Sequence, residues 1–203
     1  MPPADPTFEE LQAAVEATLD DLYRLDEAIL QTTERVVVGR MMIYLDRHLD
    51  RWLAREPDDG GLHLDQEYER FAGVTKVLRG ESSDRARKIS PDVVLHRRRT
   101  NDDGANVLAI EVKVRQDAPD RLHDLAKLSV LTGLSGAYAY GAGLRVRRDN
   151  TLGEPTAMVG LPYDAGTGEQ MRPYRFGLWL PITGHRGRDA ARTVWLHGRH
   201  REG

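Results

Sequence analysis

The sequence predicts an α/β protein in which helices precede and follow a group of strands that form a mixed sheet. Apolar residues recur at helical spacing up to about residue 55, and β-rich runs with two-residue alternation begin at residue 62. A further helical pattern returns at 117–136. Helices on both sides of a run of strands indicate a sheet covered by helices. At 203 residues the chain is long enough for one well-packed domain.

The first part of the chain is predicted to form two helices. Thr7, followed three residues later by Glu10, fits a capping box, so a first helix runs from about residue 8 into the twenties. A second helix begins near Thr33 and carries Glu34 in its first turn, at the head of its apolar face.

The stretch EPDDGG at 56–61 ends the helical part, and the hydrophobic period then changes. LHLDQEYERF at 62–71 alternates as one strand with a polar face would. A loop of 18 to 20 residues is predicted next, and loops that long are often functional. Its basic residues are Lys76, Arg79, Arg85, Arg87 and Lys88.

Two β-rich runs, DVVLHRR and NVLAIEVKV, follow and are joined through TNDDG, whose Asp-Gly pair is a hairpin signal. Helix chemistry returns at 117–136, where Pro119 suits the first turn and Gly133 or Gly136 can stop the helix. GAYAYGAGLRVRR reads as one more strand and 149–173 as a loop. The single domain is thus divided into N-terminal helices at 1–60, a core at 61–148, and a loop with a short C-terminal β appendage at 149–203, whose strands are YRFGLWLPI and TVWLHGR.

Composition excludes several kinds of site and partner. The chain has no cysteine, which excludes disulfides, thiolate metal sites and cysteine nucleophiles. A metal would therefore be held by oxygen or histidine, which favours a hard ion such as magnesium. No apolar run approaches the roughly 20 residues of a membrane span, and the N-terminal residues lack a basic and apolar signal. A cytoplasmic protein without a membrane partner is expected.

The net charge of −3 conceals an asymmetry between the two parts of the chain. Residues 1–60 carry 14 acidic and 6 basic side chains, whereas residues 61–203 carry 18 acidic and 23 basic ones. The basic excess therefore lies where the strands lie. Because charged runs are usually solvated surface, this distribution permits a polyanionic partner without requiring one.

Three charged side chains interrupt the two β-rich runs. With a turn centred between Asp102 and Asp103, Asp92 lies opposite Lys113 and diagonal to Glu111. Alternation puts Glu111 and Lys113 on one strand face, so one ion could bridge the two carboxylates beside the ammonium group. Magnesium held by one or two carboxylates near a lysine suits phosphodiester hydrolysis. The alternative is an ion pair on a solvated strand face, and the apolar run before Glu111 favours the metal site.

These residues resemble the PD-(D/E)xK nuclease superfamily, the group of restriction-endonuclease-like enzymes and Holliday-junction resolvases. The resemblance rests on Pro91-Asp92 followed by Glu111-Val112-Lys113 and covers roughly residues 33 to 146 in order. The similar blocks are Glu34-Arg35, Glu67-Tyr68 with Arg70, SPDVVLHRR, NVLAIEVK, and DLAKL at 124–128. The chain departs from the family pattern at Glu69 and Arg40, outside the core residues.

The resemblance implies a restriction-endonuclease-like αβββαβ core and a nuclease that depends on Mg²⁺ or Mn²⁺. We expect an endonuclease that acts on DNA rather than RNA, and the residues themselves leave RNA and exonuclease action open. Implied metal ligands are Asp92, Glu111 and the Val112 carbonyl, with Glu67 as a ligand or an orienting partner. Lys113 would be the catalytic lysine, and Glu34 would complete the site. The side chains expected to contact phosphates are Lys76, Arg85, Arg87, Lys88, Arg97, Arg98 and Lys127.

Three readings stay open from the sequence. The first is an active nuclease, for which a homodimer is compatible with cutting two strands. The second is a catalytically silent nuclease fold that binds nucleic acid or protein, and the third is a purely structural domain. For Lys127, an ion pair with Asp124 at i,i+3 spacing is as compatible with the sequence as a substrate contact.

Overall fold

The structure, a computed structural model, describes residues 4–54, 56, 60–66, 70–71, 74–80, 83–88, 90–114, 118–134, 158–164 and 170–198. Its helices are α1 (Phe8–Leu25), α2 (Glu34–Leu49), α3 (Ala118–Leu131) and α5 (Arg186–Arg192), with short 3-10 helices η1 (Glu27–Gln31) and η2 (Asp50–Trp52). Its strands are β1 (His63–Gln66), β2 (Arg70–Phe71), β3 (Val74–Gly80), β4 (Ser83–Lys88), β5 (Val93–His96), β6 (Asn106–Lys113), β7 (Met158–Asp164), β8 (Phe176–Pro181) and β9 (Val194–His197).

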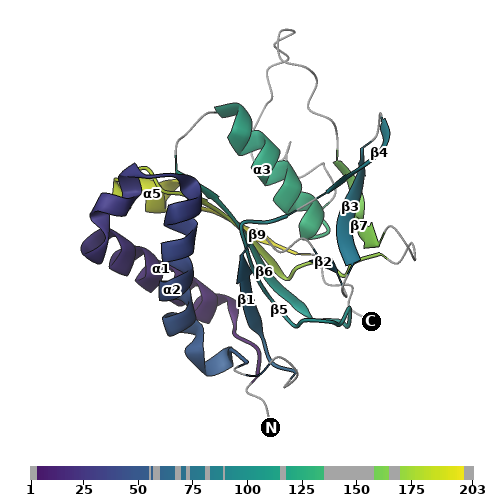
Figure 1. Ribbon diagram of the computed structural model, residues 1–203, viewed down its shortest axis with the longest axis horizontal. Coiled ribbons are helices and arrows are strands. Elements are labelled where there is room, and N and C mark those ends of the chain that lie inside the picture. The colour runs from purple at the N-terminus through teal and green to yellow at the C-terminus, as the bar shows by residue number, and fades with distance from the viewer. Residues whose placement is uncertain are drawn as a thin grey trace.

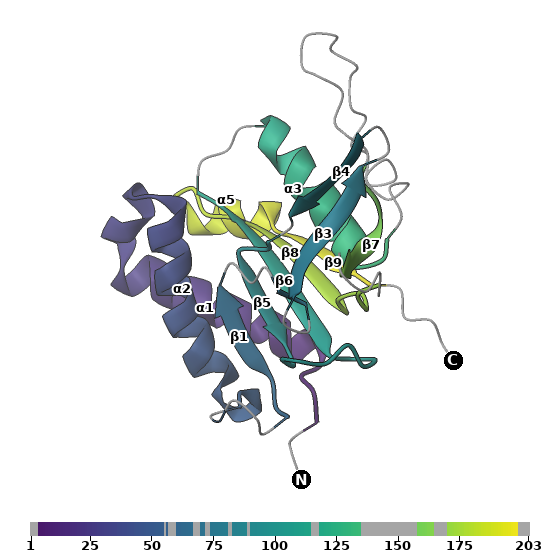
Figure 2. The ribbon, with the colours of Figure 1, turned by 45° about the vertical axis from the view of Figure 1, so that its right-hand side comes forward.

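The main sheet has five strands in the order β1-β5-β6-β8-β9. The β6–β8 pair is parallel and the other three pairs are antiparallel, so the sheet is mixed. Helices α1 and α2 cover one face and α3 covers the other (Figure 1, Figure 2). The predicted α/β class with a mixed sheet is therefore confirmed.

The two faces of the sheet are filled by different side chains of the same strands. On β6, Leu108, Ile110 and Val112 pack toward α1 and α2, whereas Ala109 packs toward α3. Strands alternate with a period of two, so Glu111 also belongs to the α3 face. The placement of this one carboxylate follows from the apolar residues on either side of it.

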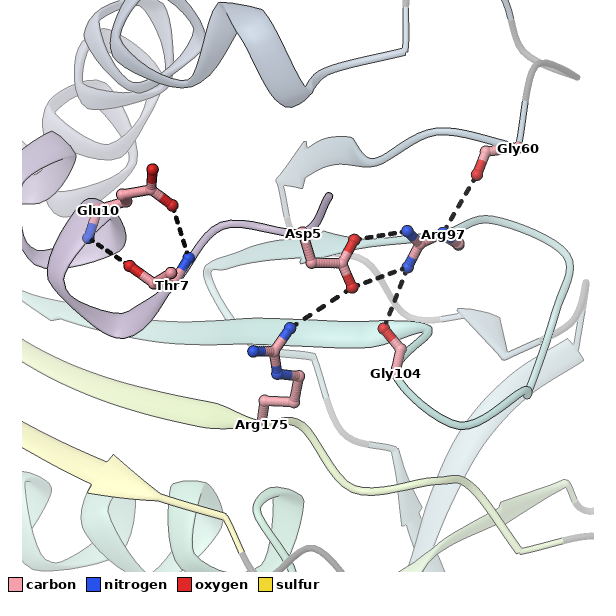
Figure 3. A network of polar contacts seen from close by, with 7 residues as sticks. All are labelled: Asp5, Thr7, Glu10, Gly60, Arg97, Gly104 and Arg175. Carbon is pink, nitrogen blue, oxygen red and sulfur yellow. Dashed lines mark hydrogen bonds and ion pairs between the residues drawn. The ribbon is translucent and has the colours of Figure 1, made fainter. Parts of the chain in front are cut away.

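The predicted helices are confirmed, together with the signals that begin and end them. Thr7 N donates to Glu10 Oε2 at 2.8 Å and Glu10 N donates to Thr7 Oγ1 at 3.3 Å, which completes the capping box of α1 (Figure 3). Thr33 is the N-cap of α2, and Glu34 is its first residue. Helix α3 ends before Gly133, whose φ of +69° favours a residue without a Cβ.

The prediction of an 18- to 20-residue loop after residue 71 is wrong. That stretch contains β3 and β4, an antiparallel pair, and the predicted single strand at 62–71 is divided into β1 and β2. β3 also pairs with β2 and with β7, which lies within the predicted loop at 149–173. Closely spaced basic residues hide the strand pattern, and β7 is distant in sequence, so local pattern could not reveal the pairing.

The C-terminal strands are not an appendage, which corrects a second prediction. β8 lies inside the main sheet beside β6, and all of its residues are buried. A strand buried on both faces reads as a continuous apolar run such as FGLWLP. The strand predicted at 136–148 lies outside the described residues. Within the described part of the chain, no helix is both long and apolar enough to cross a membrane.

Gly198 tests how tightly the β9 end is held. A Cβ on Gly198 would lie 2.3 Å from the Tyr174 carbonyl oxygen and 3.0 Å from that of Arg175, whose carbonyl also accepts from Gly198 N. Because backbone atoms cannot yield as a side chain can, Gly198→Ala is expected to destabilise the fold by about 1–3 kcal/mol. Urea unfolding measures this, and Gly187→Ala is the matched control because its Cβ meets no atom within 4 Å. Equal unfolding midpoints for Gly198→Ala and Gly187→Ala would contradict the tight packing of the chain at the end of β9.

Candidate active site

Asp92 and Glu111 lie opposite each other on neighbouring strands. The register pairs Val93 with Ile110 and Val94 with Ala109, and its continuation places Asp92 across from Glu111. The sequence prediction placed Asp92 opposite Lys113, two residues further along. Because a shift of two residues preserves the strand face, both carboxylates still share the face covered by α3.

The shape of the β5–β6 connection explains the shift in register. A β-bulge lies between Leu95 and His96, and the turn closed by Ala105 N and the Asp102 carbonyl (3.0 Å) is not centred in the loop. Gly104 occupies this turn with a φ of +82°, as the Asp-Gly signal predicts. The hairpin is therefore confirmed, but counting from a symmetrical turn misplaces its register.

Asp92 is held by the backbone of the adjacent strand. Its Oδ2 accepts a hydrogen bond from Val112 N at 2.7 Å. Burial raises the pKa of Asp92 from its ordinary value of 3.8 to about 6, against the opposing effects of the Val112 N–H and Lys127. The carboxylates of Glu34 and Asp124 raise this pKa further. Asp92 is thus a preorganised oxygen donor whose ionised form lacks enough compensating positive charge.

Glu111 is deeply buried, with 3% of its surface exposed. Burial raises the pKa of this carboxyl well above its ordinary value, and the charge of Asp92 adds to the increase. The positive charge nearest to it is Lys127 of α3, whose Nζ lies 2.6 Å from Glu111 Oε1. Lys127 Nζ also donates to the Ser90 carbonyl at 3.1 Å. Lys127 therefore ties together α3, β6 and the segment that leads into β5.

Lys113 and Glu34 meet at the end of β6. Lys113 Nζ lies 3.6 Å from Glu34 Oε2, and the two side chains are 21% and 40% exposed. Glu34 is the first residue of α2, and Lys113 is the last residue of β6. The start of α2 therefore lies near the carboxyl end of β6. The structure thus brings together four of the predicted residues, Asp92, Glu111, Lys113 and Glu34, from α2 and two strands.

The carboxylates of Asp92 and Glu111 are the side chains at this site that could bind a divalent ion. Over the described ranges, no three His, Asp or Glu side chains form a group that could hold a metal ion. Asp92 and Glu111 supply two carboxylates, and magnesium commonly takes one or two from a protein while keeping several waters. The pair therefore fits a hard ion bound partly through water. The predicted ligand Glu67 lies outside the described residues.

Two arginines predicted to contact nucleic acid are engaged in ion pairs. Arg97 contacts Asp5 at 2.5 Å and donates to the Gly60 and Gly104 carbonyls, in a network that joins the N-terminal segment to the β5–β6 loop (Figure 3). Arg98 pairs with Asp65. Both would have to leave these carboxylates to bind phosphate, so their predicted role receives no support from the contacts.

The other predicted phosphate contacts fall on three elements. Lys127 is an internal partner of Glu111, as described above. Lys76 lies on β3, and Arg85, Arg87 and Lys88 lie on β4. Only residues 89–91 separate this hairpin from Asp92, so the chain joins the four basic residues directly to the carboxylate strand.

The structure gives the predicted site residue Lys127 a different partner and adds Arg121, which sequence reasoning did not assign to the site. Lys127 pairs with Glu111, and Arg121 stacks on Trp179, the β8 neighbour of Glu111 in the register. The i,i+3 spacing of Asp124 and Lys127 suggested a pair within the helix. The partner of Lys127 instead comes from a strand, and nothing in the local sequence indicates that contact. Comparisons with protein-family models, curated proteins and solved structures give no match for this chain.

Proposed function

We propose that the chain is a metal-dependent nuclease of the restriction-endonuclease-like type that hydrolyses phosphodiester bonds, in DNA rather than RNA. The observation that carries this proposal is the meeting of Asp92, Glu111 and Lys113 on one face and at one end of two paired strands. A buried carboxylate, Glu111, opposite a partly buried one, Asp92, and followed by a lysine is costly for stability. Ionisable groups kept in such an unfavourable arrangement indicate a candidate catalytic site.

The order of elements supports the same proposal. Helix α2 is followed by β1, β5 and β6 as an antiparallel series, then by α3 and by β8 parallel to β6. This order of elements supports the αβββαβ core that the family resemblance implies. The β2, β3, β4 and β7 sheet is inserted between these elements without interrupting the five-stranded main sheet.

Each side chain would have a distinct role in hydrolysis. Asp92 and Glu111, with the Val112 carbonyl, would hold a divalent ion, which when bound neutralises phosphoryl charge and lowers the pKa of a coordinated water. Lys113, partly exposed at the strand end, is placed to orient the attacking water or to donate to a phosphoryl oxygen. Glu34 holds the Lys113 ammonium at 3.6 Å and so limits the positions this ammonium adopts.

Asp92→Asn is expected to abolish cleavage and to stabilise the metal-free fold. The folded-state pKa of about 6 exceeds the ordinary value of 3.8, so the folded protein binds more protons than the unfolded chain between these values. Wild-type stability therefore falls as pH rises from about 4 to about 6, and the asparagine removes this fall. The expected gain above pH 6 is on the order of 3 kcal/mol. Urea unfolding at pH 4.5 and pH 7.5 measures it, and a less stable variant at pH 7.5 would contradict the assignment.

The test of the function is magnesium-dependent cleavage of single-stranded, duplex and branched DNA and RNA. Wild type is expected to cut at least one DNA form, while Asp92→Asn and Glu111→Gln cut none. Thermal shift with Mg²⁺ or Mn²⁺ runs in parallel, because a site that binds metal stabilises the folded state by mass action. If wild type shows no cleavage and no metal-dependent thermal shift, the proposal is overturned.

A catalytically silent nuclease fold is the second candidate, and one observation favours it. Lys127 already balances Glu111 at 2.6 Å, so the buried carboxylate is neutralised without a metal. A silent module would bind nucleic acid in EDTA with unchanged affinity on addition of Mg²⁺ and would not cut it. Because phosphate contacts release counterions, its affinity should still fall as salt rises.

A further inference from the structure

Arg121, in the first turn of α3, has no anionic partner among the residues that the structure describes. Its Cζ lies 4.8 Å from the centroid of the Trp179 ring. Its Nε is buried and has no hydrogen-bond partner, and among the described residues no carboxylate pairs with it. The Arg121 side chain is partly exposed and its guanidinium stays charged at all physiological pH values, and leaving its buried Nε–H without an acceptor is costly.

Comparison with Arg51 shows that this arrangement is not simply a stacking contact. Arg51 stacks on Trp52 with its Cζ 3.8 Å from the ring centroid, and it also contacts Glu10 Oε1 at 2.5 Å. Arg121 shares the stacking contact and lacks the carboxylate. A stacked arginine presents its N–H groups in a fixed plane that suits bidentate binding of a phosphate or carboxylate.

A second donor beside Arg121 also lacks an acceptor. Trp179 is completely buried, and its Nε1 has no hydrogen-bond partner. Buried tryptophan N–H groups usually have one. Two neighbouring N–H donors, from a helix and from a strand, are thus left without an acceptor at one place. An anion would satisfy donors and charge together, whereas a water would satisfy only the donors.

The position of this pair relates it to the proposed catalytic residues. Trp179 on β8 is the register partner of Glu111 on β6, and its ring packs on the face covered by α3. Arg121 precedes Asp124 by one helical turn, and Asp124 acts electrostatically on both Asp92 and Glu111. Arg121 therefore lies over the β8 neighbour of Glu111, and among the described residues Lys127 pairs with Glu111 and Lys113 with Glu34.

We propose that Arg121, held over the Trp179 ring, forms a phosphate-binding subsite beside Asp92 and Glu111, and that its ligand is a phosphodiester group of a nucleic acid. The existence of the subsite rests on the unpartnered donors, and the identity of its ligand rests on the proposed function. The guanidinium would fix the phosphate next to the carboxylates, which by themselves repel it.

Binding is measured without metal, so that no cleavage occurs, and in two arms. In the first arm, inorganic phosphate is titrated while the indole N–H signals of the three tryptophans are followed by ¹⁵N–¹H NMR, with Trp179→Phe to assign its signal. In the second arm, a fluorescein-labelled single-stranded DNA 12-mer is titrated by anisotropy. Both arms use wild type, Arg121→Gln, Arg121→Lys and the matched control Arg51→Gln.

In wild type and Arg51→Gln, phosphate is expected to shift the Trp179 signal, and the 12-mer is expected to bind. Arg121→Gln should lose the shift, bind the 12-mer about 10- to 100-fold more weakly, and reduce the slope of log Kd against log salt by about 1. Arg121→Lys, which keeps the charge and loses the fork, should recover only part of the affinity.

The outcomes separate this proposal from the proposed function. A phosphate-induced shift that depends on Arg121, without DNA binding, would support the subsite and overturn its assignment to nucleic acid. Equal DNA affinity in wild type and Arg121→Gln would overturn the subsite even for an active nuclease. No phosphate shift and no DNA binding in wild type would overturn it as well. Folding of each variant is checked by its unfolding midpoint.

Discussion

Replacing Lys113 by alanine is expected to lower the single-turnover rate of DNA cleavage by about 10²- to 10⁴-fold, the usual contribution of a positioned proton-transfer group. The loss should appear in the rate at saturating enzyme, because the proposed role of Lys113 is to act on the reacting groups rather than to bind the rest of the DNA. Folding should change little, since its pair with Glu34 is partly exposed and such pairs contribute at most about 1 kcal/mol.

The absence of cysteine from the chain allows a sharper form of this experiment. Lys113→Cys can be alkylated with 2-bromoethylamine at this one position, which restores an ammonium group on a side chain of nearly the same length. Recovery of a large part of the rate would assign the effect to the ammonium. Lys76→Ala serves as the control, with weaker binding and an unchanged rate at saturation. A Lys113→Ala rate within twofold of wild type would remove Lys113 from the mechanism.

Replacing Lys127 by methionine is expected to destabilise the fold by about 3–5 kcal/mol at pH 8, because it leaves Glu111 as a buried carboxylate without its counter-ion. Glu111 is 3% exposed and its pair with Lys127 measures 2.6 Å. The pKa of Glu111 is already raised by burial, so the folded variant binds more protons than the unfolded chain above the ordinary value of 4.5. Its stability should therefore fall as pH rises, and the cost should be smaller at pH 5 than at pH 8.

Two variants make this expectation specific to the pair. Lys127→Met combined with Glu111→Gln should recover most of the lost stability, because the uncompensated charge is gone. Lys113→Met, which breaks the partly exposed pair with Glu34, should cost less than about 1 kcal/mol. Guanidinium unfolding at both pH values measures all of them. A Lys127→Met cost that is small and independent of pH would show that Glu111 does not depend on Lys127.

Local signals determine much of what the sequence predicts correctly. The capping box of Thr7 and Glu10 and the stop at Gly133 act within one or two helical turns, so α1 and the end of α3 could be placed. The two-residue period of a strand also placed Glu111 on the same face as Asp92 even though the register was wrong by two.

Contacts between distant parts of the chain were not predictable in this way. Pairing of β3 with β7 and of β6 with β8 joins segments about 70 to 90 residues apart, and such pairing depends on the whole sheet rather than on either strand. The basic residues of β3 and β4 were therefore predicted as a loop, and the buried run FGLWLP was predicted as part of a C-terminal appendage.

The sequence by itself determined the helical and strand character of most described segments, the α/β class, and the identity of the acidic residues and lysine at the candidate site. Only the tertiary structure decided that Lys127 pairs with Glu111 of β6 rather than with Asp124 of its own helix. It also decided that Arg121 lies over the Trp179 ring with no carboxylate partner among the described residues. The physical reason is that backbone hydrogen bonds and periodicity are local, whereas the balance of buried charge depends on which elements fold against each other.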